Sequence, residues 1–252
     1  MTLPIEAPNT DYDTAALREG VGRRFTWAAG FERNAHRYAH RTAMTDLPSG
    51  RVWTYAELGA DAGRLVAGLA AHGVGVGDVV AHQLPNCPEF ALLYIAAQGL
   101  RAVSSPMNFR LAPGETAYAL DQLRPAVYVY DTERSEQAPV FTAPADGSTW
   151  DETSRLFTSG TTGMPKAVPL TSFNEVLTAH DVIMHFPVNP HDRTLNMSPW
   201  FHRGGNYCAG PNTMFYVGGE VVIMPKFEAG AVLDAVEEHR LTYLVGAPTN
   251  LE

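Results

Sequence analysis

At residues 158–166 the chain reads Thr158-Ser159-Gly160-Thr161-Thr162-Gly163-Met164-Pro165-Lys166. We call this stretch the glycine loop. Its glycines tolerate backbone angles that a Cβ would forbid, so backbone N–H groups can turn toward an anion. The hydroxyl side chains add donors, and Lys166 adds a positive charge. Because each charge-assisted hydrogen bond to a phosphate oxygen contributes about 1.5–3 kcal/mol, several together would hold a polyphosphate.

The lysine of the loop is informative because lysine is rare in this chain. The sequence has 18 Lys and Arg residues, of which only Lys166 and Lys226 are lysines. A lysine here indicates a need for a compact, flexible point charge. The loop is not a Walker A motif, because Pro165 precedes the lysine and Ala167 follows it. Composition alone leaves open a second interpretation, a polar surface turn that happens to contain Gly and Thr.

The residue order of the glycine loop resembles the phosphate loop of the acyl-adenylate-forming superfamily. That superfamily includes acyl-CoA synthetases, the adenylation domains of peptide synthetases, and luciferases. The stretch Pro199-Trp200-Phe201-His202-Arg203-Gly204-Gly205, which we call the aromatic segment, resembles the part that lines the acyl pocket. The resemblance runs from about Phe31 to the end of the chain, and it also covers residues 54–58, 84–90 and 245–249.

The resemblance implies a two-step reaction with ATP, Mg²⁺ and coenzyme A as cofactors. A carboxylate attacks the α-phosphate of ATP to give an acyl-adenylate and pyrophosphate, and the thiol of coenzyme A then takes the acyl group. Lys166 and His202 become the catalytic candidates. The β- and γ-phosphates would be bound by Thr158, Ser159, Gly160, Thr161, Thr162, Gly163 and Lys166. The carboxylic acid would be bound by Phe201, His202, Gly204 and Gly205.

His202 bears on the class of acid. Relatives that activate amino acids place an aspartate here, because burying the substrate's ammonium group unpaired is costly. The histidine therefore favours a fatty or aromatic acid without an α-amine, and a role in fatty acid metabolism is one expectation. Two alternatives stay open. The chain could be an adenylation domain that serves a carrier protein, or a non-catalytic phosphate-binding protein that uses the same scaffold.

Parts of the superfamily pattern are absent from the 252 residues. These are the Tyr-Gly-x-Thr-Glu segment, the aspartate that holds the ribose, and the lysine of the mobile carboxy-terminal domain. The resemblance therefore implies the amino-terminal part of an ATP-dependent acyl-CoA ligase, which we expect not to complete a turnover alone. Since an interrupted sheet would leave an unpaired edge, we also expect self-association of the truncated chain.

Composition excludes several classes of protein. The net charge of −9 and the pI near 5.4 disfavour a nucleic-acid binder. No apolar run approaches the roughly 20 residues of a membrane span, and the first residues lack the pattern of a secretory signal, so a cytoplasmic protein is expected. Cys87 and Cys208 imply no disulfide framework. His36 and His40 lack a nearby carboxylate ligand, so no protein metal site is predicted.

Predicted helices and strands alternate, which is typical of an α/β fold with largely parallel sheets. The resemblance makes this two stacked α/β subdomains, the second of them truncated. We expect residues 1–75 to begin the second subdomain, residues 76–185 to form the first subdomain with the glycine loop, and residues 186–252 to continue the second.

Local patterns set the expected elements. Capping boxes at Thr54 with Glu57 and at Ser172 with Glu175 predict two helix starts. A long stretch poor in apolar residues, from Thr132 to Thr153, is expected to be mobile. Further helices are predicted at 88–98, 113–122 and 229–240. Strands are predicted at 79–84, 102–105, 126–130, 154–158, 167–170, 195–198, 220–224 and 242–245.

Overall fold

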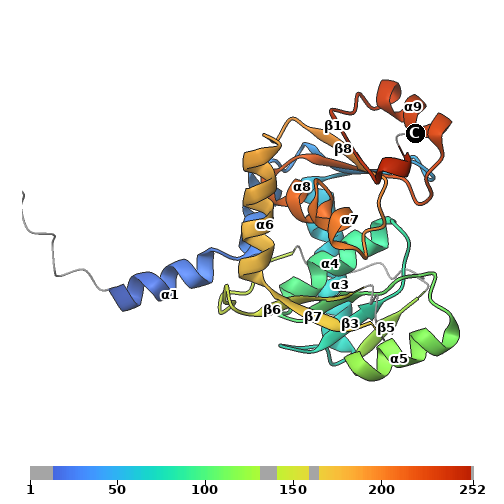
Figure 1. The fold of residues 1–252 in the computed structure, drawn as a ribbon. Coiled ribbons are helices and arrows are strands. Elements are labelled where there is room, and N and C mark those ends of the chain that lie inside the picture. Colours follow the sequence, from blue (N-terminus) through green and yellow to red (C-terminus); the bar gives the residue numbers. More distant parts are fainter. Residues whose placement is uncertain (1–13, 131–140, 159–164, 251–252) are drawn as a thin grey trace, which may run out of the picture.

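The computed structural model describes residues 14–130, 141–158 and 165–250 (Figure 1). Within these ranges, helices alternate with strands, and the strands form two five-stranded sheets. Each sheet combines parallel pairs with an antiparallel pair at one edge. The predicted α/β fold class is confirmed.

The first sheet, at the bottom of Figure 1, is built from the middle of the chain. Its strands are β3 (Val79–His82), β4 (Val103–Pro106), β5 (Val127–Val129), β6 (Glu152–Phe157) and β7 (Ala167–Thr171). They lie in the order β5-β3-β4-β6-β7, all parallel except β7, which runs antiparallel to β6. Because Phe157 pairs with Ala167, the two ends of the glycine loop lie side by side at this edge.

The second sheet, at the top of Figure 1, joins the early part of the chain to the late part. Its strands are β1 (Thr42–Asp46), β2 (Val52–Thr54), β8 (Arg193–Asn196), β9 (Glu220–Ile223) and β10 (Tyr243–Val245). They lie in the order β10-β8-β9-β1-β2, and β1 pairs parallel with β9 across most of the sequence. The predicted division of the chain at residues 75 and 185 stays a prediction, because sheet membership does not by itself define folding units.

The helices lie between the sheets, beside them and on their outer faces. They are α1 (Thr14–Arg24), α2 (Trp27–Arg37), α3 (Tyr55–Ala71), α4 (Pro88–Gly99), α5 (Pro113–Leu123), α6 (Ser172–His185), α7 (Arg203–Tyr207), α8 (Pro211–Val217) and α9 (Ala229–Glu238), followed by a 3₁₀ turn (Pro248–Asn250). Figure 1 shows α3 and α4 between the sheets and α6 along one side, spanning both halves. No helix in the described ranges has the length and apolar character needed to cross a membrane.

The main core lies around α4, whose residues are buried on nearly every side. A helix that is apolar all round must be covered all round, and α4 meets α3 and α2 as well as the first sheet. Aromatic rings fill the centre: Trp27 stacks on Phe31 with centroids 5.8 Å apart, and the edge of Tyr94 meets Trp27 at 4.9 Å. This core joins the two halves of the molecule into one packed body.

The capping box predicted at the start of α3 is confirmed. The Glu57 N–H donates to the Thr54 hydroxyl at 3.2 Å, and the Thr54 N–H donates to the Glu57 carboxylate at 2.8 Å. These reciprocal bonds satisfy two backbone groups that the first turn of a helix leaves without partners.

The capping box predicted at Ser172 and Glu175 is wrong by one residue. The cap of α6 is Thr171, which exchanges hydrogen bonds with Asn174. Ser172 is buried, and its hydroxyl accepts the Trp27 N–H at 3.0 Å instead. Glu175 therefore takes no part in the cap, and its side chain is buried in the protein interior.

The expectation of mobility for Thr132 to Thr153 is only partly testable, because residues 131–140 lie outside the described ranges. The rest of the stretch is anchored. Phe141 is buried and meets the edge of Phe31 at a centroid distance of 5.2 Å. Arg101 then holds Asp151 through two hydrogen bonds of 2.8 and 3.1 Å. Arg101 also pairs with Asp146 at 2.7 Å, and the Thr149 hydroxyl donates to the Gly22 carbonyl at 2.6 Å. Together these contacts hold the described part of a segment that looks featureless in sequence.

Candidate functional site

The two ends of the glycine loop are held together by hydrogen bonds between Thr158 and Lys166. The Thr158 N–H donates to the Lys166 carbonyl at 3.0 Å, and the Lys166 N–H donates to the Thr158 hydroxyl at 3.2 Å. The predicted phosphate-binding residues from Ser159 to Gly163 lie outside the described residues. What the structure does show is that the loop begins and ends at one fixed point, directly after β6 and before β7.

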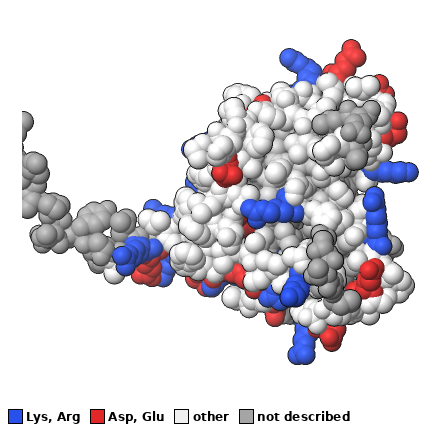
Figure 2. Space-filling model, in the orientation of Figure 1, with Lys and Arg blue, Asp and Glu red and all other residues white. Residues whose placement is uncertain are grey.

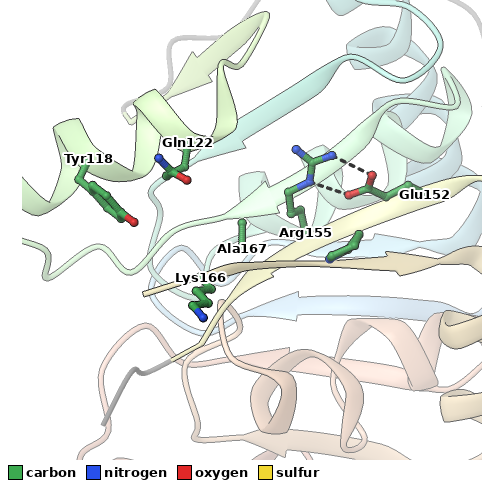
Figure 3. Close-up of a pocket in the computed structure, with 7 residues that line it drawn as sticks. Tyr118, Gln122, Glu152, Arg155, Lys166 and Ala167 are labelled. Carbon is green, nitrogen blue, oxygen red and sulfur yellow. Dashed lines mark hydrogen bonds and ion pairs between the residues drawn. The ribbon is translucent and has the colours of Figure 1, made fainter. Parts of the chain in front are cut away.

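Lys166 lies beside a cavity of about 340 Å³ (Figure 3). Its side chain is exposed. The cavity is lined by Tyr118 and Gln122 of α5, Glu152 and Arg155 of β6, Lys166, and Ala167 and Pro169 of β7. The contribution of α5 could not be predicted from the sequence, because that helix lies far from the loop along the chain.

Two cationic side chains, Arg155 and Lys166, line this cavity, and they differ in their ion-pair partners. Glu152 binds the Arg155 guanidinium through two hydrogen bonds, of 2.6 and 2.8 Å, which Figure 3 shows as dashed lines. Among the described residues, no carboxylate forms an ion pair with Lys166. The ammonium of Lys166 is thus exposed and not neutralised by a described side chain, as binding an anionic ligand requires.

On the face in Figure 2, Lys and Arg side chains lie scattered among Asp and Glu side chains, with one of the basic side chains near the middle of the molecule. The net charge of −9 therefore does not leave this face without basic groups.

The aromatic segment begins just after β8, and the 84–90 stretch holds it in place. The Asn86 side chain accepts the Trp200 N–H at 2.8 Å and donates to the Ser198 carbonyl at 3.1 Å. The ring of Phe90 meets Trp200 edge-on at 5.6 Å. Two stretches that resemble the superfamily separately in sequence are therefore in direct contact, and Asn86 is a structural link that the sequence interpretation did not single out.

Phe201 and His202 form a small aromatic cluster with Phe109. Phe201 is buried and meets Phe109 edge-on, with centroids 5.7 Å apart. The His202 ring lies against Phe201 at 4.1 Å. His202 is exposed, yet partial burial of the imidazole lowers its pKa through desolvation. The side chain is therefore neutral near pH 7, with one ring nitrogen free to donate and the other to accept.

Gly204 and Gly205 lie in different surroundings, although both are in α7. A Cβ on Gly204 would have no heavy atom within 4 Å, whereas a Cβ on Gly205 would lie 2.1 Å from the Pro199 carbonyl oxygen. The missing side chain at Gly205 lets the helix pack on the backbone of the aromatic segment. Gly204, by contrast, is exposed and faces open space.

A second cavity, of about 520 Å³, is lined in part by Phe109. It was not predicted from the sequence, because its residues come from three separate segments. Most of the lining is apolar or aromatic: Gln83, Phe109, Leu111, Pro113, Thr116, Ala117, Leu120 and Tyr130. Phe109 is thus shared between this cavity and the Phe201–His202 cluster.

Comparison with known sequences gives one consistent family. The chain matches the family described as AMP-binding enzyme over residues 31–154 and 142–252. Feruloyl-CoA synthase of Amycolatopsis sp is 34% identical over 238 residues, 86% of this chain and 48% of that protein. 4-Coumarate–CoA ligase 3 of Oryza sativa subsp. japonica is 30% identical over 241 residues, 80% of this chain and 42% of that protein. The chain spans about half the length of these curated relatives.

Solved structures share the arrangement of the two sheets. ATP-bound MatB from Rhodopseudomonas palustris has a TM-score of 0.79 and 27% identity, over 88% of this chain and 50% of that one. The inhibitor-bound N-terminal domain of FACL13 from Mycobacterium tuberculosis has a TM-score of 0.75 and 26% identity, over 90% of this chain and 64% of that one. The two-sheet fold is that of the amino-terminal domain of adenylate-forming enzymes. The chain belongs to the AMP-binding enzyme family and, within it, is similar to the acyl-CoA ligases.

Proposed function

We propose that this chain binds ATP at the glycine loop and contributes to the activation of a carboxylic acid as an acyl-adenylate, which passes its acyl group to coenzyme A. The observation that carries the proposal is the exposed Lys166 ammonium, which has no described carboxylate partner and lies beside a cavity at the closed base of the loop. The names of the curated relatives, which are CoA ligases and synthases, support the same reaction.

Each site residue has a physical role in this proposal. The Lys166 ammonium neutralises charge on the β- and γ-phosphates, and Thr158 fixes the loop that carries their backbone donors. Such neutralisation matters because the attacking carboxylate is itself an anion. A Mg²⁺ ion bound with the triphosphate would supply further neutralisation. No group of three or more potential metal ligands exists among the described residues, so we assign no protein ligand to it.

His202 and Phe201 orient the acid in this proposal. The neutral imidazole can donate a hydrogen bond to the substrate carboxylate. It does so without a tight ion pair, which would lower the reactivity of that carboxylate as a nucleophile. Phe201 supplies an apolar wall, and the open space at Gly204 admits the acyl group. The absence of a carboxylate at residue 202 favours acids that lack an α-amine. Feruloyl and indoleacetate, in the names of two relatives, are aromatic acids without an α-amine, and we keep fatty acids as the second proposed substrate class.

The test is ATP–pyrophosphate exchange with a panel of fatty and aromatic acids. We would measure it on the full-length product of the gene and on the 252 residues alone, in wild type, Lys166→Met and Lys226→Met. Lys226, the other lysine of the chain, is also exposed and is the matched control. We expect acid-dependent exchange in the full-length product, lost in Lys166→Met and kept in Lys226→Met.

Other outcomes separate the alternatives. ATP binding without exchange for any acid, amino acids included, would contradict the proposal and support the non-catalytic phosphate-binding protein. Exchange followed by transfer to a carrier protein rather than to coenzyme A would support the carrier-dependent adenylation domain. Robust exchange from the 252 residues alone would refute the expectation that this chain cannot turn over by itself.

A further inference from the structure

Glu175 is a fully buried carboxylic acid that the proposed chemistry does not use. It lies in the first turn of α6, four residues after the end of the antiparallel strand that follows the glycine loop, and none of its surface is exposed. In Figure 1, α6 runs along the side of the molecule and spans both halves. A buried carboxylate is rare unless it is paired, so its surroundings require a physical explanation.

Four neutral donors surround the carboxylate at short distances, and the Thr153 hydroxyl donates a longer hydrogen bond of 3.4 Å to Oε1. On Oε1, the Ser154 hydroxyl donates at 2.6 Å and the Tyr207 hydroxyl at 2.9 Å. On Oε2, the Tyr94 hydroxyl donates at 2.5 Å and the Asn212 amide at 2.7 Å. Each oxygen thus receives two strong hydrogen bonds, which matches the acceptor capacity of an ionised carboxylate.

No described Lys or Arg residue forms an ion pair with Glu175, so the hydrogen bonds alone compensate its burial. Burial raises the pKa of Glu175, and the hydrogen bonds from Ser154, Tyr94 and Tyr207 oppose that rise. Burial also raises the pKa of both tyrosines well above the ordinary value. Both hydroxyls therefore keep their protons and remain donors, and the group of five residues acts as a connected unit.

The donors on the two oxygens come from different places. Ser154 lies on β6, which runs directly into Thr158 at the start of the glycine loop. Tyr207 is the last residue of α7, whose amino-terminal cap is His202. Oε1 therefore connects the strand that carries the loop to the short helix that contains the end of the aromatic segment. By contrast, Tyr94 and Asn212 on Oε2 belong to the core helices α4 and α8.

We infer that Glu175 is a positioning residue: by binding Ser154 and Tyr207 through one oxygen, it sets the position of the aromatic segment relative to the glycine loop. This rests on the proposed function, in which the loop holds the nucleotide and the aromatic segment holds the acid. An in-line attack needs both substrates in one geometry, and small displacements are costly to it. Glu175 then acts on the alignment of two subsites and touches neither substrate.

The test compares a ligand that spans both subsites with a ligand that fills one. The spanning ligand is an acyl-sulfamoyl adenosine, a stable mimic of an acyl-adenylate, carrying the acid most active in exchange. The single-subsite ligand is ATP. Their affinities would be measured by calorimetry on wild type, Tyr207→Phe, Glu175→Gln and Tyr94→Phe. Tyr94→Phe is the matched control, because it removes the same kind of hydroxyl from the same carboxylate but on Oε2.

We expect Tyr207→Phe and Glu175→Gln to weaken binding of the acyl-sulfamoyl adenosine by about tenfold, or about 1.4 kcal/mol. The affinity for ATP should change by less than about twofold. Tyr94→Phe should change both affinities equally. Thermal unfolding of each variant shows whether it is folded. If Glu175→Gln does not fold, Tyr207→Phe still tests the inference.

Two results would contradict the inference in distinguishable ways. If wild type binds both ligands and Tyr207→Phe behaves like Tyr94→Phe, Glu175 has only a structural role, and the proposed function is unaffected. If wild type binds neither ligand, the proposed function fails, and the positioning role fails with it.

Discussion

The two neighbouring glycines of α7 give a stringent test of the geometry at the aromatic segment. A methyl group on Gly205 would lie 2.1 Å from the Pro199 oxygen and 2.9 Å from the Ser198 oxygen. Both contacts are with backbone, which cannot turn away as a side chain could. Overpacking typically costs about 1–3 kcal/mol, and contacts this close to backbone place Gly205→Ala at about 3 kcal/mol or above.

The same substitution at Gly204 should act in the opposite direction. The methyl group would enter open space, and alanine in a helix is favoured over glycine by about 0.5–1 kcal/mol. The two variants have identical composition and differ only in which of two adjacent residues is changed. Their free energies of unfolding should therefore differ by at least about 3.5 kcal/mol.

The assay is urea unfolding of both variants and wild type, with the slope of the transition checked for constancy. Similar stabilities for Gly204→Ala and Gly205→Ala would refute the close packing of α7 on the aromatic segment. Under the proposed function, Gly204→Ala should also weaken acid binding while it stabilises the fold. That combination would separate a role in substrate binding from a role in packing.

Three further predictions concern buried or capping groups. Burial lowers the pKa of His82 to about 3. Below about pH 6.5 the unfolded chain therefore binds a proton that the folded chain does not, and stability should fall by about 2 kcal/mol on going to about pH 5. This fall should be absent from urea titrations of His82→Leu. Glu175 acts with the opposite sign: its raised pKa makes stability fall as the pH rises above about 4.3, the ordinary value for glutamate, and Glu175→Gln should remove that contribution. Thr171→Ala should lower stability by about 1 kcal/mol through loss of the cap of α6, and an unchanged urea midpoint would contradict the cap assignment.

The sequence predicted elements well where the signal is local. The strand at Val79 and the helix from Pro88 to Gly99 follow from an apolar run, a proline at the first helical turn and a closing glycine. The capping box at Thr54 needs only four consecutive residues. By contrast, α8, which begins at Pro211, was not anticipated, because it is short and lies among other apolar segments.

The contacts that organise the site could not be predicted, because they join residues far apart in sequence. Glu175 was interpreted as a capping residue from its distance to Ser172, and nothing local shows that Ser172 serves Trp27 instead. The donors that surround Glu175 lie between 21 and 81 residues away along the chain. Similarly, the bond from Trp200 to Asn86 crosses 114 residues. Resemblance located the separate motifs, and only the fold shows which of them touch.

In the proposed function, the glycine loop binds the phosphates of a nucleotide through Lys166. Calorimetric titration of ATP into wild type, Lys166→Met and Lys226→Met tests it most directly, because binding requires no acid, coenzyme A or turnover. Loss of one charge-assisted contact to phosphate should weaken ATP binding by at least about tenfold in Lys166→Met, with Lys226→Met unchanged. Equal ATP affinities for wild type and Lys166→Met would contradict the claim.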